Sequence, residues 1–202
     1  MDVVFPMPWG TFRVRARFSC FALLAFSCLF LGAQNGGIFL LAGGLHELGH
    51  LLALWRAGAP PAFLELSALG CRMVPSQEKT LSYRQSAAVS LAGPGANLVA
   101  AGAALLAGGA HSPFFQANLV LGVLHSLPVE PLDGGLAFRG LLASRWGQRV
   151  AGRVAGGVSL CLLLPLALLG FLLLLRTRYN FTLLALSVYL MLYLALARDF
   201  TL

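Results

Sequence analysis

Residues 40–58, LLAGGLHELGHLLALWRAG, decide the fold of this chain. The stretch is apolar enough to form most of a membrane-spanning helix, which needs about 20 mostly apolar residues. It nevertheless contains His46, Glu47 and His50. Ionisable side chains inside membrane spans are rare and usually functional, because each costs about 2.5–3.5 kcal/mol at the bilayer centre on insertion scales. The stretch therefore predicts both a membrane protein and a site of chemistry within the membrane.

The whole chain is similarly apolar. Of its 202 residues, 58% are hydrophobic and only 10% are charged, and the mean hydropathy is +0.82. A soluble domain would carry about a quarter charged residues. The composition predicts an all-α polytopic membrane protein, with residues 1–202 forming a single integral-membrane domain. About six transmembrane helices are expected, at approximately 18–33, 36–56, 86–110, 114–131, 154–175 and 179–197.

The basic residues predict an orientation. If the N-terminus lies in the cytoplasm, twelve of the fourteen Lys and Arg residues fall on the cytoplasmic side, and only Arg176 and Arg178 fall on the other. Because basic residues concentrate in cytoplasmic loops, we expect a multi-pass protein of the cell membrane with both termini in the cytoplasm. We expect the first span to be retained, since Leu31 would be a poor residue before a signal-peptide cleavage site. The formal charge of +7 does not indicate nucleic-acid binding, because the arginines follow the ends of apolar runs.

Two predicted cytoplasmic segments are long enough to have structure. Within residues 57–85, two short runs of mixed polarity flank Gly70, which predicts a small β-hairpin. Residues 133–153 contain several arginines and Trp146, which suits a helix lying on the anionic inner leaflet. The four cysteines form no CxxC pair, and we expect no disulfide.

The ionisable residues of the opening stretch have the spacing of a metal site. His46 and His50 are four residues apart, so they share one face of a helix and can bind one ion together. Glu47 follows the first histidine, where it can take a proton from a water at the metal. This is the HExxH arrangement of zinc hydrolases. A structural cluster of polar residues is the alternative, but the membrane setting favours a Zn²⁺ site.

A catalytic zinc usually has three protein ligands and one open position, so a third ligand is needed. Of the seven acids, only Glu130 and Asp133 lie at membrane depth outside the HExxH helix. Asp133 belongs to the sequence PLDGG, whose proline and glycines interrupt the fourth span and allow the carboxylate to turn toward a partner. We therefore predict one zinc ion per chain, bound by His46, His50 and Asp133.

Three motifs together resemble the site-2 protease family of intramembrane zinc metalloproteases. They are HELGH at 46–50, GPGAN at 93–97 and PLDGG at 131–135, which match the family's HExxH, GPxxN and LDG motifs in order and spacing. The resemblance covers residues 40–140, and we place the catalytic core at about 36–140. The small size and six spans are most similar to the branch that contains the stage-IV sporulation protease of endospore-forming bacteria.

The resemblance implies regulated intramembrane proteolysis by a zinc metalloendopeptidase: hydrolysis of a peptide bond in a membrane-embedded or membrane-tethered protein near the cytoplasmic face. The implied partners are the lipid bilayer, a membrane-anchored protein substrate and a regulatory membrane protein, with no nucleic acid. Glu47 is the expected general base. Asn97 is a further candidate catalytic residue, either contacting substrate or joining two helices by a hydrogen bond.

The chain departs from the family pattern at two positions before the aspartate. His125 replaces the usual asparagine, and it could donate to the developing oxyanion, orient substrate, act as another ligand, or be a satisfied core histidine. Glu130 occupies a position that is usually apolar, and we expect it to be a solvated carboxylate.

Two other functions could use the same residues. A membrane metal-ion transporter would bind ions near the bilayer midplane and often shows repeat symmetry, whereas this sequence has one asymmetric site and no repeat. An inactive protease-like scaffold is disfavoured because HExxH and Asp133 are intact.

Overall fold

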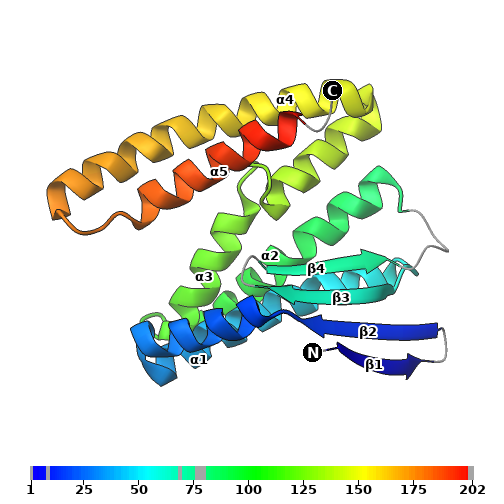
Figure 1. The fold of residues 1–202 in the computed structure, drawn as a ribbon, viewed down its shortest axis with the longest axis horizontal. Helices are drawn as coiled ribbons and strands as arrows, with labels where there is room; N and C mark the ends of the chain where they lie inside the picture. The colour runs from blue at the N-terminus through cyan, green and yellow to red at the C-terminus, as the bar shows by residue number, and fades with distance from the viewer. Residues whose placement is uncertain (1, 8–9, 68–69, 76–80, 200–202) are drawn as a thin grey trace. The chain divides into compact units, whose positions relative to one another are not determined.

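A computed structural model describes residues 2–7, 10–67, 70–75 and 81–199 (Figure 1). The elements follow the order β1 (Asp2–Met7), β2 (Gly10–Ala16), α1 (Phe18–Arg56), β3 (Pro61–Ser67), β4 (Gly70–Pro75), α2 (Tyr83–Leu106), α3 (Pro113–Ser126), α4 (Asp133–Thr177) and α5 (Thr182–Asp199). The chain divides into two compact units, Met1–Val123 and Leu124–Leu202.

The first unit begins with a four-stranded sheet in the order β1-β2-β3-β4. β3 and β4 form the antiparallel hairpin predicted between residues 57 and 85. β2 lies parallel to β3, and β1 lies antiparallel to β2. We did not predict these two N-terminal strands. Arg13 and Arg15 are exposed and alternate with the less exposed Val14 and Ala16, which is the period-two pattern of a strand.

Helix α1 leaves the sheet and returns to it. It bends at Gly32, whose φ of 77° disfavours any residue with a side chain. The first two predicted spans meet near this bend and are the two arms of α1, whose ends lead from β2 and into β3 (Figure 1). At the sheet, the exposed Arg17 guanidinium pairs with the buried carboxylate of Glu65. A buried carboxylate needs such a partner, so this pair fixes the start of α1 to β3.

Helix α2 begins with a capping box, in which the Gln85 N–H donates to Ser82 Oγ. It packs very closely on α1: a Cβ added at Gly49 would lie 2.4 Å from the carbonyl oxygen of Ala92. Small residues let membrane helices approach at this distance. As a result, backbone and polar side chains of α2 reach the histidines of α1.

In the second unit, α5 runs back along α4 (Figure 1). Gly170 on α4 has no room for a Cβ, which would lie 2.6 Å from the Leu184 nitrogen. Buried Val129, Leu163 and Leu190 form the hydrophobic cluster of this unit. The close approach of the two helices and this cluster hold the loop before α4 against both helices.

Helix boundaries in this part of the chain differ from the predicted spans in two places. α3 ends at Ser126, five residues before the predicted end, because the prolines of the following LPVEP sequence disfavour a helix. Residues 133–153, expected as a separate cytoplasmic helix, instead form the start of α4. A bend at Gly147, with φ 78°, lies within this stretch, and the helix then continues through the fifth predicted span.

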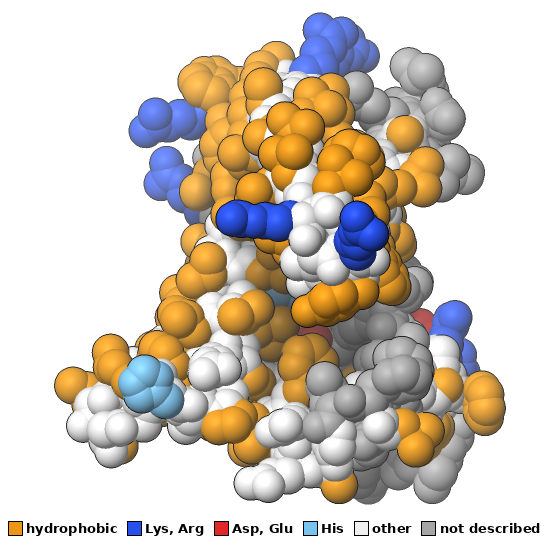
Figure 2. Space-filling model, turned by 90° about the vertical axis from the view of Figure 1, so that its left-hand side faces the viewer, with side chains coloured by type: hydrophobic (Ala, Val, Ile, Leu, Met, Phe, Trp, Pro, Cys, Tyr) orange, Lys and Arg blue, Asp and Glu red, His pale blue; other side chains and the backbone are white. Residues whose placement is uncertain are grey.

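Three of the described helices are long and apolar enough to span a membrane: Gly32–Arg56, Tyr83–Leu106 and Asp133–Thr177. This is fewer than the six predicted, because the first arm of α1, α3 and the described apolar part of α5 are shorter than a full span. Hydrophobic side chains cluster over the helical surface (Figure 2), with Leu29 80% and Val99 73% exposed. Apolar surface of this kind fits lipid. The predicted class, a helical polytopic membrane protein with a small β element, is confirmed.

Candidate active site

His46 and His50 lie one turn apart on α1 with their Nε2 atoms facing each other. The two atoms are 3.2 Å apart, and the rings meet edge to face with centroids 4.8 Å apart. His46 is buried and His50 is half-buried. The HExxH spacing therefore brings the two imidazoles together as expected from their positions on one helix face.

The other ring nitrogen of His46 faces Asn97 of α2. Nδ1 of His46 and Oδ1 of Asn97 are 2.7 Å apart, and both residues are buried. Nδ2 of Asn97 donates to the Ala42 carbonyl and to Oδ1 of Asn118, each at 2.9 Å. Because the Ala42 carbonyl can only accept, the amide nitrogen must face it and Oδ1 must face the imidazole. In neutral His46 the proton therefore sits on Nδ1.

His50 is held in a similar way by the backbone of α2. Its Nδ1 lies 2.8 Å from the Val89 carbonyl oxygen, which can only accept, so Nδ1 is the donor. A Cβ added at Gly93 would lie 2.2 Å from Nε2 of His50. Gly93, the first glycine of the GPGAN motif, is therefore needed to leave room for this imidazole.

These contacts make the two Nε2 atoms suitable metal ligands. With both Nδ1 atoms protonated, each neutral ring directs an Nε2 lone pair toward the other. Two lone pairs 3.2 Å apart repel unless a cation binds both. Zinc binds histidine nitrogen at about 2.0–2.1 Å with tetrahedral geometry, which separates two such nitrogens by about 3.3 Å. Histidine ligands also typically donate their second N–H to an acceptor, as both do here. The pair fits two ligands of one zinc ion.

Glu47, the predicted general base, is half-buried and follows His46 directly on α1. Consecutive residues on a helix point about 100° apart. Glu47 is therefore next to the histidine pair but does not belong to the helix face that His46 and His50 share. Its role as the base stays a prediction.

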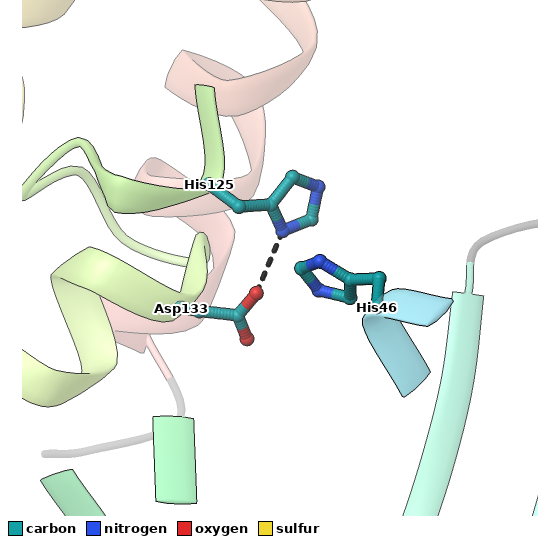
Figure 3. A group of neighbouring side chains, drawn as sticks. All are labelled: His46, His125 and Asp133. Atoms are coloured by element: carbon teal, nitrogen blue, oxygen red, sulfur yellow. Dashed lines mark hydrogen bonds and ion pairs between the residues drawn. The ribbon is translucent and has the colours of Figure 1, made fainter. Parts of the chain in front are cut away.

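In the second unit, Asp133 is the first residue of α4 and bonds to His125. Nδ1 of His125 lies 2.7 Å from Oδ2 of Asp133 (Figure 3). The two side chains are 30% and 18% exposed. A carboxylate can only accept, so the imidazole donates. The N-terminus of α4 also stabilises the negative charge. His125 thus contacts the predicted third ligand, and its oxyanion role stays a prediction.

The chain before Asp133 is tightly folded. A Cβ added at Gly134 would lie 2.3 Å from the carbonyl oxygen of Ser126, and one at Gly135 would lie 2.4 Å from the carbonyl carbon of Val129. The two glycines after the aspartate are therefore needed for close packing of the loop on the start of α4. Substituting either would move the backbone that carries Asp133.

Glu130 is not the solvated carboxylate that we expected. Its side chain is only 12% exposed, and Oε1 accepts from Nη1 of Arg139 at 3.2 Å. Its backbone N–H donates to Oγ of Ser159 at 2.9 Å, and that hydroxyl donates to the Ala155 carbonyl. The expectation failed because a partly buried carboxylate is stable when it has a cationic partner. These bonds fasten the loop to two separate turns of α4.

Asn118 is a site residue that we did not predict. It lies fully buried on α3, accepts from Asn97, and donates to the Phe114 carbonyl at 2.9 Å. The available signal was an amide side chain within an apolar helix, which is costly unless it is hydrogen-bonded. For Asn97, the bonds agree with the interhelical alternative, and contact of Asn97 with substrate stays a prediction.

A solved structure has a similar fold. The site-2 protease from Methanocaldococcus jannaschii matches with a TM-score of 0.62 and 18% sequence identity, over 94% of this chain and 92% of that one. The fold is similar to that of a site-2 protease. This fold similarity covers nearly the whole chain and agrees with the motif resemblance at residues 40–140. No family model and no curated protein sequence matches. The sporulation branch stays a prediction.

Proposed function

We propose that this chain is an intramembrane zinc metalloprotease of the site-2 type, which hydrolyses a peptide bond of a membrane-embedded or membrane-tethered protein near the cytoplasmic face. The histidine pair is the observation that carries the proposal. In both His46 and His50, Nδ1 donates to an acceptor on α2. The two Nε2 atoms face each other at 3.2 Å. A purely structural pair of histidines has no need for both rings to be fixed in the ligating tautomer.

His46, His50 and Asp133 would hold the ion. Carboxylate oxygen and imidazole nitrogen are both zinc ligands, and three protein ligands leave a position open for chemistry. When bound, zinc would activate water at neutral pH and polarise the scissile carbonyl. The hydrogen bond from His125 limits the orientations of the Asp133 carboxylate.

The other steps belong to side chains of the chain itself. Glu47 accepts a proton from the attacking water and returns it to the leaving amine, which are the two halves of general acid–base catalysis. His125, which contacts Asp133 and stands where the family usually has asparagine, is the proposed further donor to the developing oxyanion. Asn97 holds His46 in its ligating tautomer.

The substrate would bind in an extended conformation, because the carbonyl of a helical peptide bond is already hydrogen-bonded and is shielded by side chains. β4 is an outer strand of the sheet, whereas β3 lies between two neighbours. An outer strand can bind an extended peptide through backbone hydrogen bonds. Since β1 and β2 belong to the same sheet, a cytoplasmic N-terminus would place the sheet on the cytoplasmic side of the cell membrane. A regulatory membrane protein would control access to this edge.

The test uses the full chain in lipid nanodiscs, with metal content measured by mass spectrometry. The substrate is a reporter tethered by one membrane span. We expect one zinc per chain and cleavage that a chelator abolishes. Glu47→Gln should keep the zinc and lower the cleavage rate by about 10²–10⁴. His46→Ala should lose the zinc, whereas His111→Ala, at an exposed loop histidine, should keep it.

A wild-type protein that binds no zinc, or a Glu47→Gln variant that cleaves at the wild-type rate, would contradict the proposal. Zinc transport across a vesicle membrane without any cleavage would instead support a transporter.

A further inference from the structure

We infer that Asn118 is a positioning residue for the metal ligand His46, acting through Asn97. The inference rests on the proposed zinc site and assigns a role within it to a side chain that reaches His46 through two hydrogen bonds. The bonds run from the Phe114 carbonyl to Asn118, from Asn118 to Asn97, and from Asn97 to Nδ1 of His46.

Each step of this path has a fixed direction. Nδ2 of Asn118 donates to the Phe114 carbonyl, one turn earlier on α3, so Oδ1 of Asn118 is turned toward Asn97. Oδ1 accepts one N–H of Asn97, and the Ala42 carbonyl accepts the other. Both N–H groups of the Asn97 amide are therefore used, and its oxygen remains to accept from His46.

The direction matters because an amide can rotate. A rotated Asn97 would present N–H groups to Nδ1 of His46, which would favour the opposite tautomer and remove the lone pair from Nε2. With Asn118 present, rotation breaks two hydrogen bonds of the Asn97 amide nitrogen. Without Asn118, the same rotation costs the amide nitrogen only its bond to the Ala42 carbonyl. Asn97 and Asn118 are both fully buried, so water does not replace the lost bonds cheaply.

The test measures zinc affinity of the full chain in nanodiscs by competition with a chelator, using zinc alone as the probe. Loss of an outer-shell partner of a metal-binding histidine typically costs 10–100-fold in affinity. We expect Asn118→Leu to weaken zinc binding by about 10-fold, the lower end of this range, because Asn118 contacts Asn97 and not the histidine itself. Asn118→Asp, which can still accept from Asn97, should restore most of the affinity. Gln116→Leu, an exposed position on α3, is the matched control and should not change it.

A double-mutant cycle separates positioning from general packing. If Asn118 acts through Asn97, adding Asn118→Leu to Asn97→Leu should cause no further loss of zinc affinity. The thermal midpoint of the metal-free protein reports packing independently. If Asn118→Leu does not fold, Asn118→Ala takes its place in the cycle.

The outcomes distinguish this inference from the proposed function. No zinc in the wild type would overturn both. Zinc in the wild type with unchanged affinity in Asn118→Leu would overturn the inference alone. The same holds if the two asparagine substitutions weaken binding additively, or if Asn118→Asp loses as much affinity as Asn118→Leu.

Discussion

The two sets of proposed zinc ligands are held in different ways. In the first unit, His46 and His50 project from the middle of a helix and are fixed by a buried amide and a backbone carbonyl of α2. In the second unit, Asp133 begins a helix after a loop, and its carboxylate accepts a hydrogen bond from the 30% exposed side chain of His125. The first set therefore depends on helix packing, and the second depends on the shape of a loop.

This difference has a consequence for function. A pair of ligands fixed by packed helices keeps its geometry without the ion, because moving either imidazole would disturb two helices. A carboxylate at a loop–helix junction can adjust when an ion binds. We expect zinc affinity to depend steeply on the contacts between α1 and α2, and more gradually on the contacts around Asp133.

The largest effect is expected at the helix crossing. Gly93→Ala would place a Cβ 2.2 Å from Nε2 of His50, so the ligand atom or the helix must move. We expect zinc affinity to fall by about 100-fold, the upper end for disturbed support of a ligand. Competition with a chelator measures the zinc affinity. Gly95→Ala is the matched control on the same helix, since a Cβ there meets nothing within 4 Å. Equal affinity in the two variants would show that the histidine pair does not depend on this crossing.

Local sequence patterns were enough to predict that His46 and His50 lie together. Four-residue spacing puts His46 and His50 on one helix face whatever surrounds them. The break in the helix before Asp133 was predicted because prolines and glycines interrupt a helix in any context. The hairpin around Gly70 followed from local polarity in the same way.

Contacts between distant segments could not be predicted from such patterns. The parallel pairing of β2 with β3 joins Val14 to Leu64 across the whole of α1. The hydrogen bond between Asn97 and Asn118 depends on how α2 meets α3. Periodicity identifies which face of an element is apolar, but it does not identify which other element covers that face. The same limit explains why Glu130 was expected to be solvated, since nothing local indicates Arg139 as its partner.

A second prediction tests how much the carboxylate of Asp133 depends on the hydrogen bond from His125. His125→Leu removes the N–H that Asp133 accepts, and we expect zinc affinity to fall by about 10-fold. His125→Asn supplies an amide N–H at the position where the site-2 protease family has asparagine, so it should stay close to the wild type. Chelator competition gives the affinity, and the cleavage rate at saturating zinc reports any separate catalytic role. If the leucine variant binds zinc as tightly as the wild type, the bond to His125 does not position Asp133.

The smallest effect is expected from the ion pair that fastens the same loop. Oε1 of Glu130 and Nη1 of Arg139 are 3.2 Å apart, and the two side chains are 12% and 38% exposed. A partly exposed pair is screened by solvent and contributes little, so Arg139→Gln should lower the free energy of unfolding by about 1 kcal/mol or less. The bond from the Glu130 N–H to Ser159 remains in this variant and still holds the loop to α4. Zinc affinity should therefore change less than in His125→Leu. Thermal unfolding in detergent and chelator competition measure the two quantities, with the exposed Arg149→Gln as control. A loss of zinc affinity larger than that of Gly93→Ala would reverse the comparison, because the loop would then position its ligand more strictly than the packed helices position theirs.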